Sequence, residues 1–89
     1  MPYIKQDDRA KFAPALGAVQ DAMEPGVTTG ELNYLLTSVA FAYLIRKGEI
    51  RYIHINDVLG ALEGAKAEFY RRVAAPYEEK ARANNGDVY

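Results

Sequence analysis

The clearest hydrophobic pattern in the chain is an apolar stripe that begins at Leu32. Its members recur every three or four positions, which is the spacing of one buried face of an α-helix: Leu32, Leu35, Leu36, Val39 and Tyr43. The segment Thr28–Glu31 directly before the stripe has the form of a capping box, in which a threonine hydroxyl and a glutamate carboxylate each accept a backbone N–H. Gly48 then follows two basic residues and is typical of a helix stop. We therefore predict a central helix between these signals.

A shorter helix is predicted before the central one. Pro14 is typical of the first position of a helix, and the apolar spacing from there continues to Met23. Pro25-Gly26 forms the turn that follows. Asp7–Phe12 is expected to add a helical turn at the front, because acidic residues are favourable near a helix N-terminus. Residues 1–6 are expected to form an extended arm.

The third helix is predicted to be the longest. Glu49–Ile55 is rich in β-branched and aromatic residues, which favours a strand, but the sequence offers no second strand to pair with it. We therefore interpret this segment as a loop that leads into a helix starting between Tyr52 and Asp57. Pro76 removes a backbone hydrogen bond, so we expect a kink or a break there, with helix resuming over Tyr77–Ala83.

These elements predict an all-α fold, namely a single helical domain of residues 1–89 with a three-helix core, a short N-terminal element and a kink at Pro76. The central helix is apolar on a second side as well, through Tyr34, Phe41, Leu44 and Ile45. A helix that is apolar nearly all round needs burial on more than one side. We therefore predict a homo-oligomer with this helix near the interface. The alternative is a monomer in which the third helix and the N-terminal arm cover both sides.

Composition narrows the classes of protein without naming one. The 89 residues carry a formal net charge of -1, so the electrostatic basis for binding nucleic acid or a membrane surface is absent. There is no cysteine, hence no disulfide, thiolate metal site or cysteine nucleophile. The most apolar stretch, Leu32–Ile45, is too short to span a bilayer, and the first ten residues lack the apolar run of a signal peptide. We expect a soluble, cytoplasmic protein.

Two glycines lie inside the predicted third helix, at Gly60 and Gly64. Each costs roughly 1 kcal/mol relative to alanine, and close approach of another backbone is the common compensation. One interpretation is a tight helix crossing at an oligomer interface, or a bare surface on which a flat ligand lies. The other is tight packing against the central helix within one chain.

A candidate ligand site follows on the same helix. Glu63, Lys66 and Tyr70 share one side by steps of three and four residues, and Arg71 flanks them. Arginine offers a planar fork that suits phosphate, and tyrosine offers a flat face with a polar tip. Tyr77 would join them if Pro76 turned the following segment back. This set suits a small phosphate-bearing, nucleotide-like ligand, with Arg71 as the anion contact. The alternative is a solvated charged face with ion pairs four residues apart.

Motifs for catalysis are scarce. His54 is the one histidine, so two histidine ligands for a metal are not available within one chain. Neither a phosphate-binding loop nor a dinucleotide-binding glycine motif is present. An all-helical nucleoside-triphosphate pyrophosphatase would need paired carboxylates on two helices, and the central helix offers Glu31 alone. We therefore favour a protein that is not an enzyme and holds neither a cofactor nor a metal.

Several blocks of the chain resemble a short family of unknown function. They are MPYIKQDDRAKF at the start, GELNYLLT in the middle, and GALEGAKAEFYRRVAAPYEEK followed by NGDVY towards the end. Two places depart from the family pattern: Ala13–Val27 differs freely, and Arg51 stands where a helix-capping serine is expected. The resemblance implies an origin in bacteria, tailed phages or prophages.

That context implies a function by analogy alone. Small helical phage proteins include oligomeric sponges, which bind a nucleotide-derived immune signal of the host and withhold it without chemistry. We therefore expect sequestration of such a ligand by a homo-oligomer. The alternative is a structural or protein-interaction module that acts through its oligomer surface.

Overall fold

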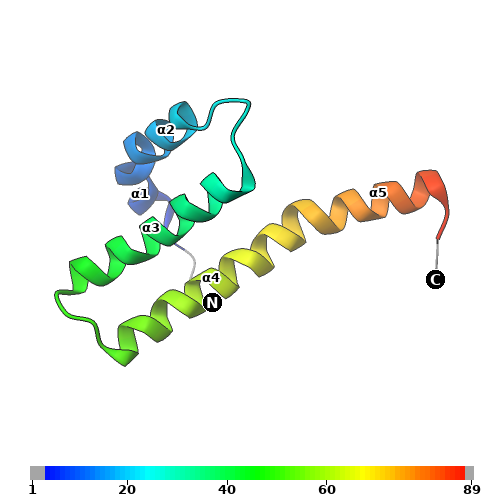
Figure 1. The fold of residues 1–89 in the computed structure, drawn as a ribbon. Coiled ribbons are helices and arrows are strands. Elements are labelled where there is room, and N and C mark those ends of the chain that lie inside the picture. Colours follow the sequence, from blue (N-terminus) through cyan, green and yellow to red (C-terminus); the bar gives the residue numbers. More distant parts are fainter. Residues whose placement is uncertain (1–3, 88–89) are drawn as a thin grey trace. The chain divides into compact units, whose positions relative to one another are not determined.

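The structure is a computed structural model, and it describes residues 4–87. Every regular element within that range is helical, which confirms the all-α prediction (Figure 1). In chain order they are the helices α1 (Gln6–Arg9), the 3-10 turn η1 (Ala10–Phe12), α2 (Ala13–Ala22), α3 (Thr29–Lys47), α4 (Tyr52–Phe69), the π-helical turn η2 (Tyr70–Ala74) and α5 (Ala75–Asn85). The contacts divide them into two units, with the division after Ala42 inside α3.

The first unit opens with a nearly continuous run of helical turns from α1 through η1 to α2. Arg9 ties its start, because Nε and Nη2 both donate to the carbonyl oxygen of Ile4, at 3.2 and 3.1 Å. Pro14 lies in the first turn of α2, where its missing N–H costs nothing. The predicted helical turn and the predicted first helix are therefore both confirmed. Of the expected N-terminal arm, residues 1–3 lie outside the described range.

The start of α3 is the capping box that the sequence predicts. The backbone N–H of Glu31 donates to Oγ1 of Thr28 at 3.1 Å, and the backbone N–H of Thr28 donates to Oε1 of Glu31 at 3.0 Å. At the other end, Gly48 has a φ of +94°, a conformation that favours glycine. The helix therefore begins and ends where its local signals place it.

The second unit contains the last turn of α3 and everything after it. The hydroxyl of Tyr43 donates to Oδ2 of Asp57 at 3.0 Å, which ties the end of α3 to α4. Helix α4 begins at Tyr52, the early limit of the predicted range, and Arg51 caps it without a side-chain hydrogen bond. The β-branched segment is thus partly helical, since it has no strand to pair with.

Helices α4 and α5 follow one another without interruption (Figure 1). The turn between them, η2, is a π-helical turn. The backbone N–H of Ala75 bonds to the carbonyl of Tyr70, five residues earlier. Pro76 has no N–H, and in a regular helix its ring would collide with the carbonyl of Arg72. The π turn gives the ring room. The disturbance expected at Pro76 therefore falls in the preceding turn, and the chain does not break.

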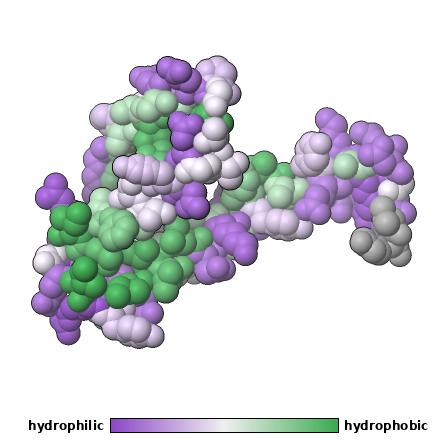
Figure 2. Space-filling model, in the orientation of Figure 1, coloured by the Kyte–Doolittle hydropathy of each residue, from purple (hydrophilic) through white to green (hydrophobic). Residues whose placement is uncertain are grey.

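The predicted core face of α3 is wrong as a description of the single chain. Among residues 4–87 no side chain is buried, and four of the five predicted core residues are between 39% and 60% exposed: Leu32, Leu36, Val39 and Tyr43. Leu35 alone of the five is half-buried. Apolar side chains accordingly lie on the surface of the molecule (Figure 2). The three expected helices form, but neither unit contains enough packed elements to enclose a core.

The surface at Gly60 is open within the second unit. A Cβ atom placed on it would meet no atom within 4 Å, apart from its chain neighbours and the backbone of its own helix.

Candidate functional site

Three of the five predicted ligand residues line one shallow hollow. Glu63, Lys66 and Tyr70 surround a space of about 430 Å³ at the junction of α4 and η2. Its remaining lining comes from Ala67, Phe69 and Ala74, so most of the surface is apolar. The hollow therefore combines one ammonium group, one carboxylate and two aromatic rings.

Arg71 does not line this hollow. Its Nη2 atom donates to Oε2 of Glu68, and Nε of Arg72 donates to Oε1 of the same carboxylate at 2.7 Å. The hydrogen bonds from Arg71 and Arg72 lower the pKa of Glu68 to about 2. The predicted anion contact is thus already paired with a carboxylate three residues before it.

Tyr77 also lies outside the hollow. Because the helix continues past Pro76, the segment after it does not turn back, and the Tyr77 side chain is 73% exposed. The structure therefore brings together Glu63, Lys66 and Tyr70, which are spaced by helical turns. Tyr77, which would have joined them only after a sharp bend, lies outside the hollow.

One further residue belongs to this surface, and the sequence analysis missed it. Glu78 accepts a hydrogen bond from the hydroxyl of Tyr70, which raises the pKa of that phenol above its usual value. Eight residues take about 2.2 turns of a regular α-helix, which would set the two about 80° apart around the axis. The extra residue of the π turn between them reduces this angle, so the spacing in the sequence alone gave no signal.

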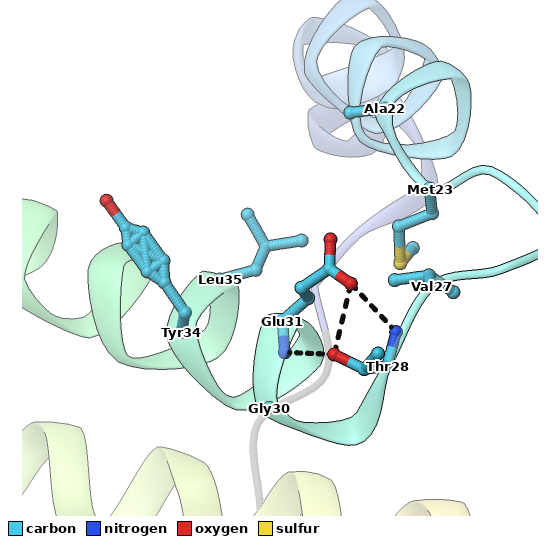
Figure 3. A pocket seen from close by; sticks show the side chains of 8 residues that line it. All are labelled: Ala22, Met23, Val27, Thr28, Gly30, Glu31, Tyr34 and Leu35. Atoms are coloured by element: carbon cyan, nitrogen blue, oxygen red, sulfur yellow. Dashed lines mark hydrogen bonds between the residues drawn. The ribbon is translucent and has the colours of Figure 1, made fainter.

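A second hollow of about 490 Å³ lies in the first unit, between the end of α2 and the start of α3 (Figure 3). Met23, Val27 and Leu35 give it an apolar lining, together with Ala22, Gly30 and Tyr34. Its polar members, Thr28 and Glu31, are bonded to each other in the capping box, and Figure 3 shows these three bonds. The polar atoms of Thr28 and Glu31 are therefore used to cap the start of α3.

His54 has an acidic neighbour in the structure. Its Nδ1 atom lies 3.8 Å from Oδ2 of Asp57, the oxygen that also accepts from Tyr43. The distance is too long for a hydrogen bond, and Nδ1 has no hydrogen-bond partner. Asp57 joins the end of α3 to α4 through its hydrogen bond with Tyr43.

Neither a metal centre nor a membrane span is found in the part of the chain that the structure describes. No three acidic, histidine or cysteine side chains gather there as metal ligands. No helix of residues 4–87 has the length and apolar character that crossing a bilayer requires.

The described residues 4–87 define a small all-helical protein with surface hollows, and no side chain among them is buried. Residues 1–88 match the family described as a domain of unknown function, DUF6899, and the chain belongs to that family. No curated protein and no solved structure matches the chain.

Proposed function

We propose that this chain is a self-associating helical module, in which copies cover one another's apolar helix faces and the assembled surface binds a protein partner. One observation carries the proposal: within residues 4–87 no apolar side chain is buried. Folding is driven mainly by removing apolar surface from water, so a helical chain whose large side chains are at most half-buried gains only part of that stabilisation alone.

Exposed apolar side chains occur in both units, which supports the same proposal. In the first unit Val39 is 60% exposed and Phe41 58%, and in the second unit Phe69 is 65% exposed. Contact with further copies can cover these side chains.

Sedimentation equilibrium of the full chain tests self-association directly. We expect a mass that is a multiple of 9.9 kDa at micromolar concentration. Val39→Glu, which puts a charge on an exposed apolar position of α3, should shift the equilibrium towards monomer, whereas Lys47→Glu at the end of the same helix should shift it less. A cooperatively folded monomer of 9.9 kDa would overturn the proposal.

A second candidate is sequestration of a small phosphate-bearing, nucleotide-derived ligand at the hollow of Glu63, Lys66 and Tyr70. It is favoured by the meeting of a cation and two aromatic rings in this concave surface. Arg71 would contribute only by giving up or sharing its pairing with Glu68.

Thermal melting with ATP, and with inorganic phosphate as a control, tests this second candidate. A ligand that binds only the folded state raises the melting temperature. A charge-assisted hydrogen bond is worth roughly 1.5–3 kcal/mol, so Lys66→Ala should weaken binding by about 10- to 150-fold. Arg71→Ala should weaken it less, because Arg71 is paired with Glu68 and does not line the hollow. Lys80→Ala, outside the hollow, is the matched control. An unchanged melting temperature with ATP would reject nucleotide binding at this surface.

A further inference from the structure

Helix α5 ends on an asparagine that a glycine follows, Asn85-Gly86. A glycine has no Cβ, so its backbone nitrogen is open to approach by the side chain of the residue before it. Every other asparagine of the sequence is followed by a residue with a side chain: Asn33, Asn56 and Asn84. The end of α5 therefore holds the asparagine whose side chain meets the least hindered backbone nitrogen.

The surroundings of this pair are open to solvent. Asn85 and Gly86 are both exposed, and they line a hollow of about 390 Å³ at the end of α5 together with Arg82 and Asp87. A Cβ atom placed on Gly86 would meet no atom within 4 Å, apart from its chain neighbours. Water therefore reaches both the Asn85 amide and the Gly86 backbone.

One hydrogen bond restrains the Gly86 nitrogen. Its N–H donates to the carbonyl oxygen of Arg82 at 2.8 Å and closes the last turn of α5. Gly86 adopts a φ of +85°, which favours glycine directly after a helix. A hydrogen-bonded amide becomes available only when its bond opens, and helix ends open more readily than helix centres. This bond, the cap of α5, therefore controls access to the nitrogen.

We infer that Asn85 is a site of spontaneous deamidation, and that the cap of α5 sets its rate. The Gly86 nitrogen loses its proton to solvent base and attacks Cγ of Asn85. A carbon–nitrogen bond forms to Gly86, the bond from Cγ to the side-chain nitrogen breaks, and that nitrogen leaves as ammonia. Water then opens the resulting succinimide ring at either carbonyl, which gives aspartate or isoaspartate. Water is the one co-reactant, and this chemistry makes asparagine a thermolabile residue.

The reaction uses the same atom that caps the helix. A succinimide nitrogen carries no hydrogen, so the bond from Gly86 to Arg82 is lost when the ring forms. The new carboxylate then lies at the C-terminal end of α5, where the helix dipole disfavours negative charge. It also adds a charge of the same sign beside Asp87. Conversion therefore weakens the last turn of α5, and the loss of ammonia makes the change permanent.

Incubation of the full chain at mildly alkaline pH, followed by tandem mass spectrometry, tests the site. Base speeds the reaction, because the Gly86 nitrogen must lose its proton. We expect Asn85 to lose its amide while Asn84 keeps it. Asn84 is the matched control, because it is exposed in the same last turn of α5 but precedes a residue with a side chain. Equal conversion of the two asparagines, or none at Asn85, would overturn the assignment.

Ala83→Gly tests whether the cap sets the rate. Glycine is less favourable than alanine within a helix, so the last turn should open, and Asn85 should react, about fivefold faster than in the parent chain. Ala18→Gly makes the same exchange in α2 of the first unit and should leave the rate unchanged. An equal rate in Ala83→Gly and the parent chain would contradict control by the cap.

Asn85→Asp reproduces the aspartate product and tests its effect on the helix. Relative to the rate in the unfolded chain, hydrogen exchange of the Gly86 N–H should be about two- to fivefold faster than in the parent chain. Asn85→Gln keeps an uncharged amide and is the control, with exchange close to that of the parent chain. Identical exchange in both variants would reject the weakening of the last turn by the new charge.

Discussion

At the scale of single residues, Thr28 holds the start of α3 through both its hydroxyl and its backbone N–H. The hydroxyl accepts from the N–H of Glu31, and the N–H donates to the Glu31 carboxylate, at 3.1 and 3.0 Å. Each bond satisfies a donor that the first turn of a helix leaves without an intrahelical partner. All atoms involved lie within three residues, so this start does not depend on the rest of the fold.

We expect Thr28→Ala to lower the free energy of unfolding by about 1 kcal/mol, the usual cost of losing a threonine cap. Urea unfolding followed by circular dichroism measures this loss. Thr29→Ala, one position later and without a part in the capping box, should change the free energy far less. Equal effects of the two substitutions would contradict the role of Thr28.

Glu68 is the most perturbed acid among the described residues, through its bonds to Arg71 and Arg72. Its pKa of about 2 in the folded chain lies below the ordinary value of 4.5. A group with a lowered folded pKa stabilises the fold above its unfolded pKa, and that stabilisation is lost as the pH falls through the folded pKa.

The parent chain should therefore be more stable than Glu68→Gln above pH 4.5, and the difference should close as the pH falls towards 2. Thermal melting at several pH values follows the difference. Added salt should reduce it as well, because both arginines are exposed. A difference that is constant over this pH range would mean that the ion pairs do not contribute to stability.

At the scale of elements, the π turn links the constraint from Pro76 to the direction of the side chains before and after it. Tyr70–Ala74 take up one residue more than a regular turn, which gives room to the proline ring. The same extra residue rotates the side chains of α5 relative to those of α4. It therefore determines which side of α5 lies in line with the apolar side of α4. A local feature of the backbone thereby decides where an exposed stripe runs.

Pro76→Ala should let this turn become regular α-helix. We expect the helical content to rise, because the backbone hydrogen bond that proline cannot donate is restored. Circular dichroism measures this effect. Pro14→Ala is the control, because Pro14 lies in the first turn of α2. An unchanged spectrum for Pro76→Ala would mean that the π turn does not depend on Pro76.

At the scale of the whole molecule, the lack of buried side chains ties folding to assembly. If copies supply one another's core, the folded state is favoured by mass action. For a dimer of 89-residue chains, a tenfold rise in protein concentration should raise the melting temperature by about 3–5 °C. Scanning calorimetry over two decades of concentration measures this. A constant melting temperature would indicate a chain that folds alone.

Only those residues of the candidate site that are related by helical spacing could be predicted from the sequence. Glu63, Lys66 and Tyr70 line one hollow as their spacing indicates. Arg71 was placed there by proximity along the chain, but a carboxylate three residues earlier holds its side chain. Tyr77 depended on a sharp bend, and the π turn replaced that bend with continuous helix.

The sequence by itself determined that the chain is helical, where α2 and α3 begin and where α3 ends, because a first-turn proline, a capping box and a glycine stop act over three or four residues of backbone. The tertiary structure alone decided which side chains meet over longer distances, such as Tyr43 with Asp57, and that no core closes within residues 4–87. The burial of an apolar stripe depends on whether other helices are available to pack against it. The spacing of a stripe predicts that it will be covered, and does not say whether the cover comes from the same chain.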